Sequence, residues 1–382
     1  MPDTRSPRFV FIDLLRGLAV FVMIEVHVVN ALLLPELRSG DFFRVLNFIN
    51  GLVAPSFIFI AGFAFAISAH RKWNDYTTMS RPLLVQLRRL LIIILIGYVL
   101  HLPFFSFRKI LAAATPREWE IFFQADVLHC IGISLIGLQL LVLFFKRESR
   151  VYGIAAILTV VFVFGAPLMW MKDFAEVLPL PIAAYLNNTH ISMFPLFPWS
   201  GYLMAGAVLS YFFVQMNEVG LITRFMKLAT ILGGLMIAGG FVFEALPISI
   251  YPVADFWRTS PQFFFIRLGI VILLLVGLWW GEQRFHYRGS FLTRFGQESL
   301  IVYTTHLMII YGSFLGDQSI ASMVGRTQGY GMAFAVSAGL IVLMIGLAYL
   351  WHWLKRDRPA FARIILWVGT AIFIGLFLWR EY

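Results

Sequence analysis

The sequence predicts an all-α polytopic membrane protein, a single bundle of about 10–11 transmembrane helices forming one domain over residues 1–382. Its composition is 60% hydrophobic and 13% charged, whereas a soluble domain carries about 25% charged residues. Apolar stretches of about 20 residues, enough to cross a bilayer, recur along the whole chain. Lys and Arg alternate between rich and poor loops, which is typical of the positive-inside pattern.

Length and hydropathy define about eleven expected spans, and the loop charges predict a cytoplasmic N-terminus. We expect the first span to be retained, because it is too long for a signal-peptide core and contains Asp13 and Arg16. The expected spans are roughly 9–35, 45–69, 89–107, 125–145, 151–171, 195–215, 228–246, 261–280, 296–315, 329–352 and 364–380.

Charge and motif content exclude several classes of function. The net charge of +10 lies in short, scattered loops, so we expect it to set topology and expect no nucleic-acid partner. The single cysteine, Cys130, rules out an internal disulfide. HExxH, CxxC and P-loop motifs are missing from the sequence, so metalloprotease, redox and NTPase chemistry lack their residues and we expect no metal site.

The first span carries polar residues that share one helix face. At about 100° per residue, His27 lies roughly 20° from Arg16 around the helix and about 16 Å along it. Asp13 and Asn30 follow the same stripe, while Glu25 lies nearly opposite. Ionisable groups at membrane depth are costly and indicate function by default. The alternative is that Arg16 reaches the headgroups and His27 is a hydrogen-bonded interface histidine.

Two further spans contribute candidate residues. Arg88 and Arg89 open the third span, where they either anchor it on the cytoplasmic side or bind a phosphate, and His101 closes it. In the fourth span, Asp126 and His129 are i,i+3 neighbours, so the carboxylate can orient the ring and raise its basicity. The alternative for this pair is a locally satisfied polar contact.

The ninth span, FGQESLIVYTTHLMIIYG, holds the other strong candidate. Ser299, Tyr303 and His306 share a face of this helix. His306 is expected near the middle of the membrane, where an unpaired polar side chain is least stable. After His27 it is the best single candidate for a functional residue.

The stretch DLLRGLAVFVMIEVH resembles the first catalytic span of the transmembrane acyltransferase superfamily. Arg16 and His27 match the Arg followed after ten residues by a His that marks this span in the acyltransferase-3 branch. Later segments are more similar to the heparan-α-glucosaminide N-acetyltransferase-like branch and its bacterial relatives: APSFIFIAGFAFAIS, DVLHCIGISLIGL, FPWSGYLMAGAVLS and FGQESLIVYTTHLMIIY. The resemblance covers most of the chain, to the end of the ninth span.

The resemblance implies acyl transfer across a membrane, here expected to be the inner membrane of a bacterium. Acetyl-CoA or another acyl-CoA would dock from the cytoplasm, and a glycan or other amine or hydroxyl acceptor would be modified outside. A polar tunnel would then need bases and cations from several spans. The catalytic candidates are His27, His306, Asp126 and His129, with His101 at a similar depth, and the CoA-binding candidates are Arg16, Arg88 and Arg89.

One departure affects the choice of base. In the animal lysosomal enzymes of the second branch, the His regarded as catalytic lies in the loop after the first catalytic span. Here that loop, residues 36–44, contains no His. His27 therefore takes the role if the protein follows the acyltransferase-3 pattern.

Two other classes of function remain open. A proton-coupled secondary transporter or exporter would use the same His, Asp and Arg residues as a proton relay. The sequence has no convincing internal repeat, which disfavours the inverted-repeat transporter folds. Intramembrane polar groups disfavour a non-enzymatic scaffold. Membrane lipids are expected partners, and a homodimer is one of the oligomeric states that the sequence leaves open.

Overall fold

The structure, a computed structural model, describes residues 9–246, 251–252, 255–285, 290–312 and 319–380. The described residues are helical apart from turns, loops and one isolated bridge between Leu33 and Gln328, so the predicted all-α polytopic fold is confirmed. Among them, nine helical stretches are long and apolar enough to cross a membrane. These are Asp41–Arg71 (α2, Asp41–Asn50, with α3, Val53–Arg71), α5 (Arg81–Leu100), α8 (Val127–Phe145), α9 (Glu148–Met169), α11 (Leu196–Glu218), α12 (Ile222–Ala245), α13 (Pro261–Arg284), α17 (Tyr330–Asp357) and α18 (Pro359–Trp379).

The other two expected spans are helical but differ from simple membrane crossings. The first is α1 (Val10–Leu32), which is long enough but carries Asp13, Arg16 and Glu25. The ninth is broken at Glu298 into α14 (Phe291–Gln297) and α15 (Ser299–Tyr311). At 1.5 Å per residue, the 13 residues of α15 reach only about 20 Å, short of a bilayer core.

The third expected span is shifted. We expected residues 89–107, but α5 starts earlier, at Arg81, where the Ser80 hydroxyl caps the helix by accepting from the N–H of Leu83. The helix ends at Leu100, and a short 3-10 turn and a separate short helix follow it. The basic residues that open the expected span therefore lie within the helix rather than at its start.

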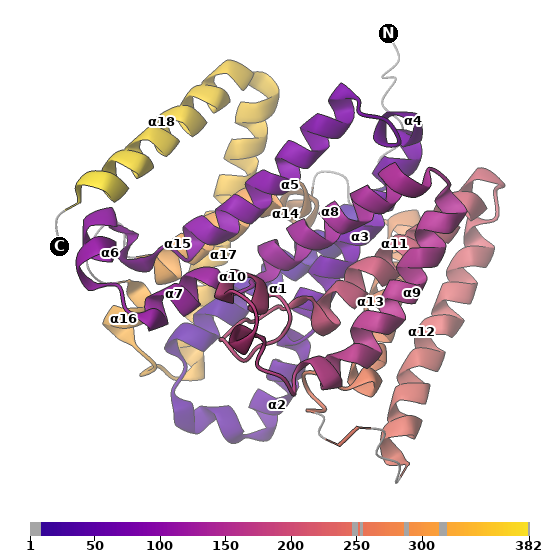
Figure 1. Cartoon of the computed structure of the whole chain (residues 1–382), viewed down its shortest axis with the longest axis horizontal. Helices are drawn as coiled ribbons and strands as arrows, with labels where there is room; N and C mark the ends of the chain where they lie inside the picture. The colour runs from indigo at the N-terminus through magenta and orange to yellow at the C-terminus, as the bar shows by residue number, and fades with distance from the viewer. Residues whose placement is uncertain (1–8, 247–250, 253–254, 286–289, 313–318, 381–382) are drawn as a thin grey trace. The chain divides into compact units, whose positions relative to one another are not determined.

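The described chain divides into two compact units, each built from segments distant in sequence. The first unit comprises Met1–Val53, Leu102–Thr115 and Gly277–Tyr382, and the second comprises Ala54–His101 and Pro116–Val276. Figure 1 labels their helices. The remaining elements are η1 (Pro35–Ser39), η2 (Pro103–Phe105), α6 (Phe107–Ala113) and α16 (Ile320–Val324) in the first unit, and α4 (Trp73–Tyr76), α7 (Pro116–Phe123), η3 (Phe174–Glu176) and α10 (Leu180–Ala183) in the second.

In the first unit α1 packs against α14, α15 and α17. Two glycines allow a very close approach of α1 to α14. A Cβ added at Gly17 would lie 1.9 Å from the carbonyl oxygen of Leu292, and one added at Gly296 would lie 2.0 Å from that of Asp13. Small residues let membrane helices pack backbone to backbone. This contact brings the polar start of α1 against the end of α14.

In the second unit α11 packs against α8 and α9, and α5 packs against α8. The α5–α8 contact again depends on a glycine, because a Cβ at Gly97 would lie 2.8 Å from the ring of His129. The bare backbone of α5 at Gly97 thus forms one wall around the His129 side chain.

The surface of several helices is apolar. In α18 only 6% of the most apolar window is buried within the protein, and in α5 and α12 the share is 17%. Soluble proteins rarely expose contiguous apolar surface of this extent. Hydrocarbon must cover it, so the protein is an integral, multi-pass membrane protein.

Candidate functional site

The first polar cluster joins two histidines that are 279 residues apart in the chain. His27, on α1, places its Nδ1 3.0 Å from Nε2 of His306, on α15. Both helices belong to the first unit. The two best candidates for a functional residue in the sequence are therefore direct hydrogen-bond partners.

The partners of His306 fix the tautomer of both rings. Nδ1 of His306 lies 2.8 Å from the carbonyl oxygen of Val302, and a carbonyl can only accept, so this nitrogen carries a proton. In the neutral ring Nε2 of His306 is then the acceptor, and Nδ1 of His27 must donate to it. Neutral His27 consequently carries its lone pair on Nε2.

The two imidazole rings also differ in solvent exposure. His306 is completely buried, and both of its nitrogens are engaged. His27 is only partly buried. Tyr311 packs its ring edge on His27 at 6.1 Å between centroids and donates its hydroxyl to the His27 backbone carbonyl at 2.9 Å. Of the two histidines, His27 is the one that can meet a substrate.

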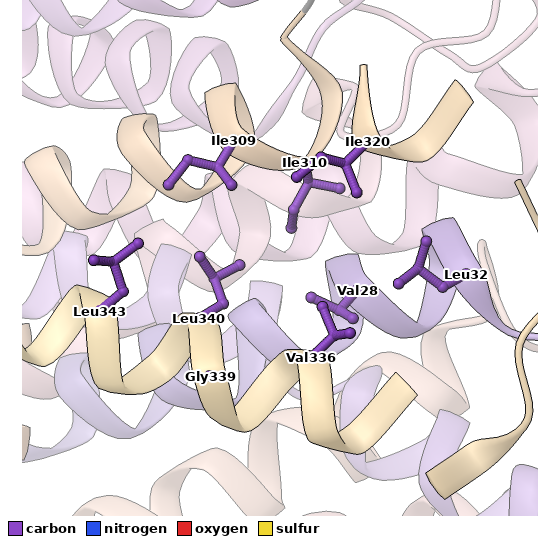
Figure 2. A pocket seen from close by; sticks show the side chains of 9 residues that line it. All are labelled: Val28, Leu32, Ile309, Ile310, Ile320, Val336, Gly339, Leu340 and Leu343. Carbon is purple, nitrogen blue, oxygen red and sulfur yellow. The ribbon is translucent and has the colours of Figure 1, made fainter. Parts of the chain in front are cut away.

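The helices that carry this pair also line an apolar cavity of about 230 Å³ (Figure 2). Val28 directly follows His27, and Ile309 and Ile310 come three and four residues after His306. Leu340 and Leu343 of α17 face them across the cavity. Neither His27 nor His306 is among the residues that line the cavity, so it is an apolar space on the same helices and not the space around the imidazoles.

Arg16 lies at the other end of the polar face of α1. Its guanidinium is 4.0 Å from the Asp13 carboxylate and donates to the carbonyl of Gly296 at 3.4 Å. Its side chain stays 22% exposed. The predicted polar stripe of α1 thus faces two helices. Near the start of α1 it faces α14, and near the end of α1 it faces α15.

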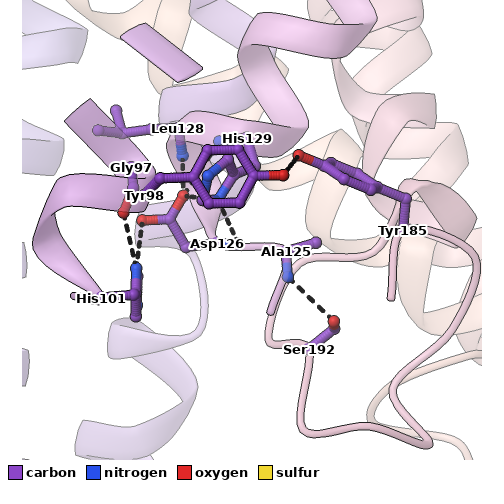
Figure 3. A network of polar contacts seen from close by, with 9 residues as sticks. All are labelled: Gly97, Tyr98, His101, Ala125, Asp126, Leu128, His129, Tyr185 and Ser192. Carbon is purple, nitrogen blue, oxygen red and sulfur yellow. Dashed lines mark hydrogen bonds and ion pairs between the residues drawn. The ribbon is translucent and has the colours of Figure 1, made fainter. Parts of the chain in front are cut away.

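The second polar cluster contains Asp126 and His129 in the second unit (Figure 3). Asp126 caps α8: its Oδ1 accepts from the N–H groups of Leu128 at 2.8 Å and His129 at 3.0 Å. In return the N–H of Asp126 donates to Nδ1 of His129 at 3.3 Å. This reciprocal capping box accounts for the i,i+3 spacing.

The His129 ring is enclosed by aromatic side chains and backbone. Tyr98 packs on it at 4.2 Å between centroids, and the Tyr98 hydroxyl lies 3.0 Å from that of Tyr185. His101 donates from Nδ1 to the carbonyl of Gly97 at 2.8 Å and lies 3.9 Å from Oδ2 of Asp126. The structure therefore brings His101 together with the Asp126–His129 pair (Figure 3).

Two buried polar atoms in this cluster have no hydrogen-bond partner among the described residues. They are Oδ2 of Asp126 and Nε2 of His129. Because Nδ1 of His129 accepts from a backbone N–H, Nε2 carries the proton. A buried acceptor and a buried donor without partners are costly. A small polar group, from a substrate or from water, would satisfy them.

The two arginines at the start of the third expected span occupy different surroundings. Arg89 lines a cavity of about 290 Å³ together with Lys72 and Arg81. Both arginines are exposed, but Arg88 does not line the cavity.

A third cluster lies outside the membrane-spanning segments. His190 places Nδ1 3.3 Å from Glu120 on α7 and Nε2 3.0 Å from Asp173 beside η3. Partial burial lowers the pKa of His190, but the two carboxylates outweigh it, so the pKa lies above the ordinary value of 6.5. Hydrogen bonds from His190 and from Arg117 lower the pKa of Glu120, and the one from His190 has the larger effect.

One buried polar group was not identified from the sequence. Glu298, at the break between α14 and α15, is buried and accepts from His352 at 3.0 Å and Lys355 at 2.5 Å on α17. Nε2 of His352 lies 2.7 Å from Arg294. The i,i+3 spacing of His352 and Lys355 indicates that the two side chains share a helix face. It does not identify their common partner, Glu298, which lies more than fifty residues away in the sequence.

Comparison with models of protein families gives a match. The model of the family described as "Heparan-alpha-glucosaminide N-acetyltransferase, catalytic" matches residues 8–239. That range contains α1 with Arg16 and His27, and α8 with its Asp126 cap. It ends before α15 and His306. No curated protein matches the chain.

Proposed function

Because the chain belongs to the heparan-alpha-glucosaminide N-acetyltransferase catalytic family, it is a membrane acetyltransferase, and we propose that acetyl-CoA is its donor. The acetyl group goes to an amine or hydroxyl of a glycan or small molecule. The family description favours the amino group of a glucosaminide as acceptor. The donor binds from the cytoplasm and the acceptor is modified on the outer face of a bacterial inner membrane.

The observation that carries the mechanism is the hydrogen bond from His27 to His306. It leaves the lone pair of neutral His27 on Nε2, the position from which a general base acts. His27 takes the proton of the acceptor N–H or O–H as that atom attacks the thioester carbonyl. The new C–N or C–O bond forms, the C–S bond breaks, and the CoA sulfur leaves and takes up the proton.

The other polar residues have supporting roles in this proposal. His306 is a positioning residue, since both of its nitrogens are engaged and it holds the His27 ring. Oδ2 of Asp126 and Nε2–H of His129 bind a polar group of a substrate, because neither atom has a hydrogen-bond partner among the described residues. The partly exposed Arg16 binds an anionic or carbonyl group of the donor.

The experiment is a transfer assay with the purified full chain in proteoliposomes. Acetyl-CoA is supplied on the side of the N-terminus and glucosamine on the other, and mass spectrometry measures acetylated glucosamine and free CoA. Equal amounts of the two products, dependent on protein and on acetyl-CoA, are expected. A panel of hydroxyl acceptors is run in parallel, and comparison of glycans from wild-type and deletion cells then identifies the natural acceptor.

Vesicles also carry a pH-sensitive dye so that the transporter alternative is measured in the same preparation. Proton movement driven by an acceptor gradient without acetyl-CoA, together with no acetylated product from any acceptor, would replace the acetyltransferase proposal by a proton-coupled transporter. Thermal stabilisation of the protein by acetyl-CoA supplies an independent check, since a ligand of the folded state raises its melting temperature.

A further inference from the structure

A cavity of about 290 Å³ at the start of α5, within the second unit, is lined by three cations. Lys72 lies between α3 and α4, and Arg81 and Arg89 lie on α5 about 12 Å apart along its axis. Gln86, from the same helix, and Tyr76, from α4, complete the polar lining. In the sequence, Lys72 and Arg81 are general positive-inside charges and Arg89 is a CoA-binding candidate, whereas in the structure the three line one space.

These three cations lack acidic partners, whereas several other arginines of the protein have them. No hydrogen bond or ion pair joins the charged groups of Lys72, Arg81 or Arg89 to another residue in the part of the chain that the structure describes. By contrast, Arg117 pairs with Glu120 at 3.0 Å and Arg356 with Asp357 at 2.8 Å. Three like charges around one cavity repel each other, and a bound anion removes that cost.

The backbone adds to the same field. Arg81 and Pro82 are the first residues of α5, and Pro82 also lines the cavity. The N-terminal end of a helix carries a partial positive charge that stabilises anions. Ser80 already caps one N–H there, that of Leu83. Cationic side chains and the helix end thus act on one space large enough for a phosphate group.

We propose that this cavity binds the nucleotide end of the CoA donor through its 3′-phosphate. The proposal rests on the function proposed above, which supplies CoA as the ligand. Arginine forks match phosphate oxygens in pairs, and Lys72 adds a point charge. The cavity also lies at the end of the unit where the loop charges predict the cytoplasm. The phosphate of an anionic lipid headgroup has the same chemistry, and the test separates the two sources.

The test compares Arg81→Gln and Lys72→Gln with Arg88→Gln in the full chain. Arg88 is the matched control, because it is an exposed cation on the same helix, directly next to Arg89, and does not line the cavity. Calorimetry measures binding of acetyl-CoA and of 3′-dephospho-acetyl-CoA to each protein. A charged hydrogen bond contributes about 1.5–3 kcal/mol, so we expect Arg81→Gln to weaken acetyl-CoA binding about tenfold or more.

The two ligands make the test specific for the phosphate. Wild type and Arg88→Gln should bind the dephospho form about tenfold more weakly than acetyl-CoA. Arg81→Gln should discriminate between the ligands much less, because the partner of the phosphate is already missing. If Arg81→Gln and Lys72→Gln discriminate as strongly as Arg88→Gln, the nucleotide site is wrong.

The lipid arm uses nanodiscs of phosphatidylcholine with or without phosphatidylglycerol. If the cavity variants lose stabilisation by phosphatidylglycerol and bind acetyl-CoA as wild type does, the site is a headgroup site and our proposal is overturned. The outcomes also separate this site from the function. If the wild type transfers acetyl groups and the cavity variants bind acetyl-CoA as it does, the nucleotide site is wrong and the proposed function stands. If CoA binding depends on the 3′-phosphate but no acceptor is acetylated, the site stands and the proposed function is wrong.

Discussion

Nδ1 of His27 donates to Nε2 of His306 at 3.0 Å, and His306 in turn donates from Nδ1 to the Val302 carbonyl. This chain ends on a backbone oxygen that can only accept, so it has one direction in the neutral state. Its consequence is a division of roles between two histidines that the sequence could not distinguish. His27 has a nitrogen left for chemistry and His306 does not.

The first prediction concerns His27 as the base. We expect His27→Ala to lower turnover by about 10²–10⁴-fold, the usual contribution of general base catalysis. Activity is measured per mole of folded, monodisperse protein, and acetyl-CoA binding is measured beside it and should change little. Near-wild-type turnover in His27→Ala, with an inactive His306→Ala, would transfer the role of base to α15.

The second prediction concerns His306 as a positioning residue. His306→Leu removes the acceptor for His27 Nδ1–H, so we expect kcat to fall while KM for acetyl-CoA stays near its wild-type value. His306→Gln keeps an acceptor oxygen on a flexible side chain and should restore part of kcat. Equal loss of kcat in both variants, accompanied by equal loss of folded protein, would mean that His306 serves packing alone.

The third prediction concerns the close contact between α1 and α14. Gly17→Ala and Gly296→Ala each place a Cβ within about 2 Å of a backbone oxygen of the other helix. We expect a loss of stability of about 1–3 kcal/mol or more from overpacking. Thermal unfolding followed by fluorescence-detected size exclusion measures it. The control is Gly369→Ala in α18, where a Cβ meets nothing within 4 Å and alanine favours a helix.

The fourth prediction concerns pH and the segment that His190 holds. The pKa of His190 is raised, so its stabilising effect is complete below the unfolded value of 6.5 and is lost as pH rises through the folded pKa. The pKa of Glu120 is lowered, so its effect is present above the unfolded value of 4.5 and is lost as pH falls through the folded pKa. Hydrogen-exchange protection of the segment around His190, taken relative to the intrinsic exchange rate at each pH, should be greatest between these limits.

His190→Gln should abolish the loss of protection on the alkaline side, because the amide does not titrate. Part of the loss on the acid side should remain, because Arg117 still pairs with Glu120. The matched control is Arg117→Gln, which removes the other cation that pairs with Glu120 and keeps His190. If exchange in wild type is equally protected at pH 5.5 and well above neutrality, the two carboxylates do not hold a charged His190.

Local features of the fold and the site were predictable from the sequence, and long-range ones were not. Each of the eleven expected spans has a helical counterpart, because apolar length is a local property. The i,i+3 contact of Asp126 and His129 is local as well. The break at Glu298 depends on partners in α17. The pairing of His27 with His306 depends on how α1 packs on α15, which a single sequence does not encode in any short pattern.

The CoA-binding candidates show the same limit. The sequence did not distinguish Arg88 from Arg89, yet only Arg89 lines the cavity. Lys72 reaches the same cavity because the short segment between α3 and α5 turns back on the helix start. The orientation of the N-terminus toward the cytoplasm stays a prediction from loop charge.

The complete burial of His306 bears on a competition that every acyl-transfer enzyme faces. A base that activates an amine or hydroxyl can also activate water, and the thioester would then be hydrolysed without product. His306 is completely buried, and its two nitrogens are occupied by His27 and by the Val302 carbonyl, so its ring offers water no free hydrogen-bonding position, and excluding water prevents such side reactions. The ratio of transfer to hydrolysis therefore depends on a side chain that does not itself take the proton, and His306→Gln, whose amide has hydrogen-bonding positions to spare, would shift it toward hydrolysis.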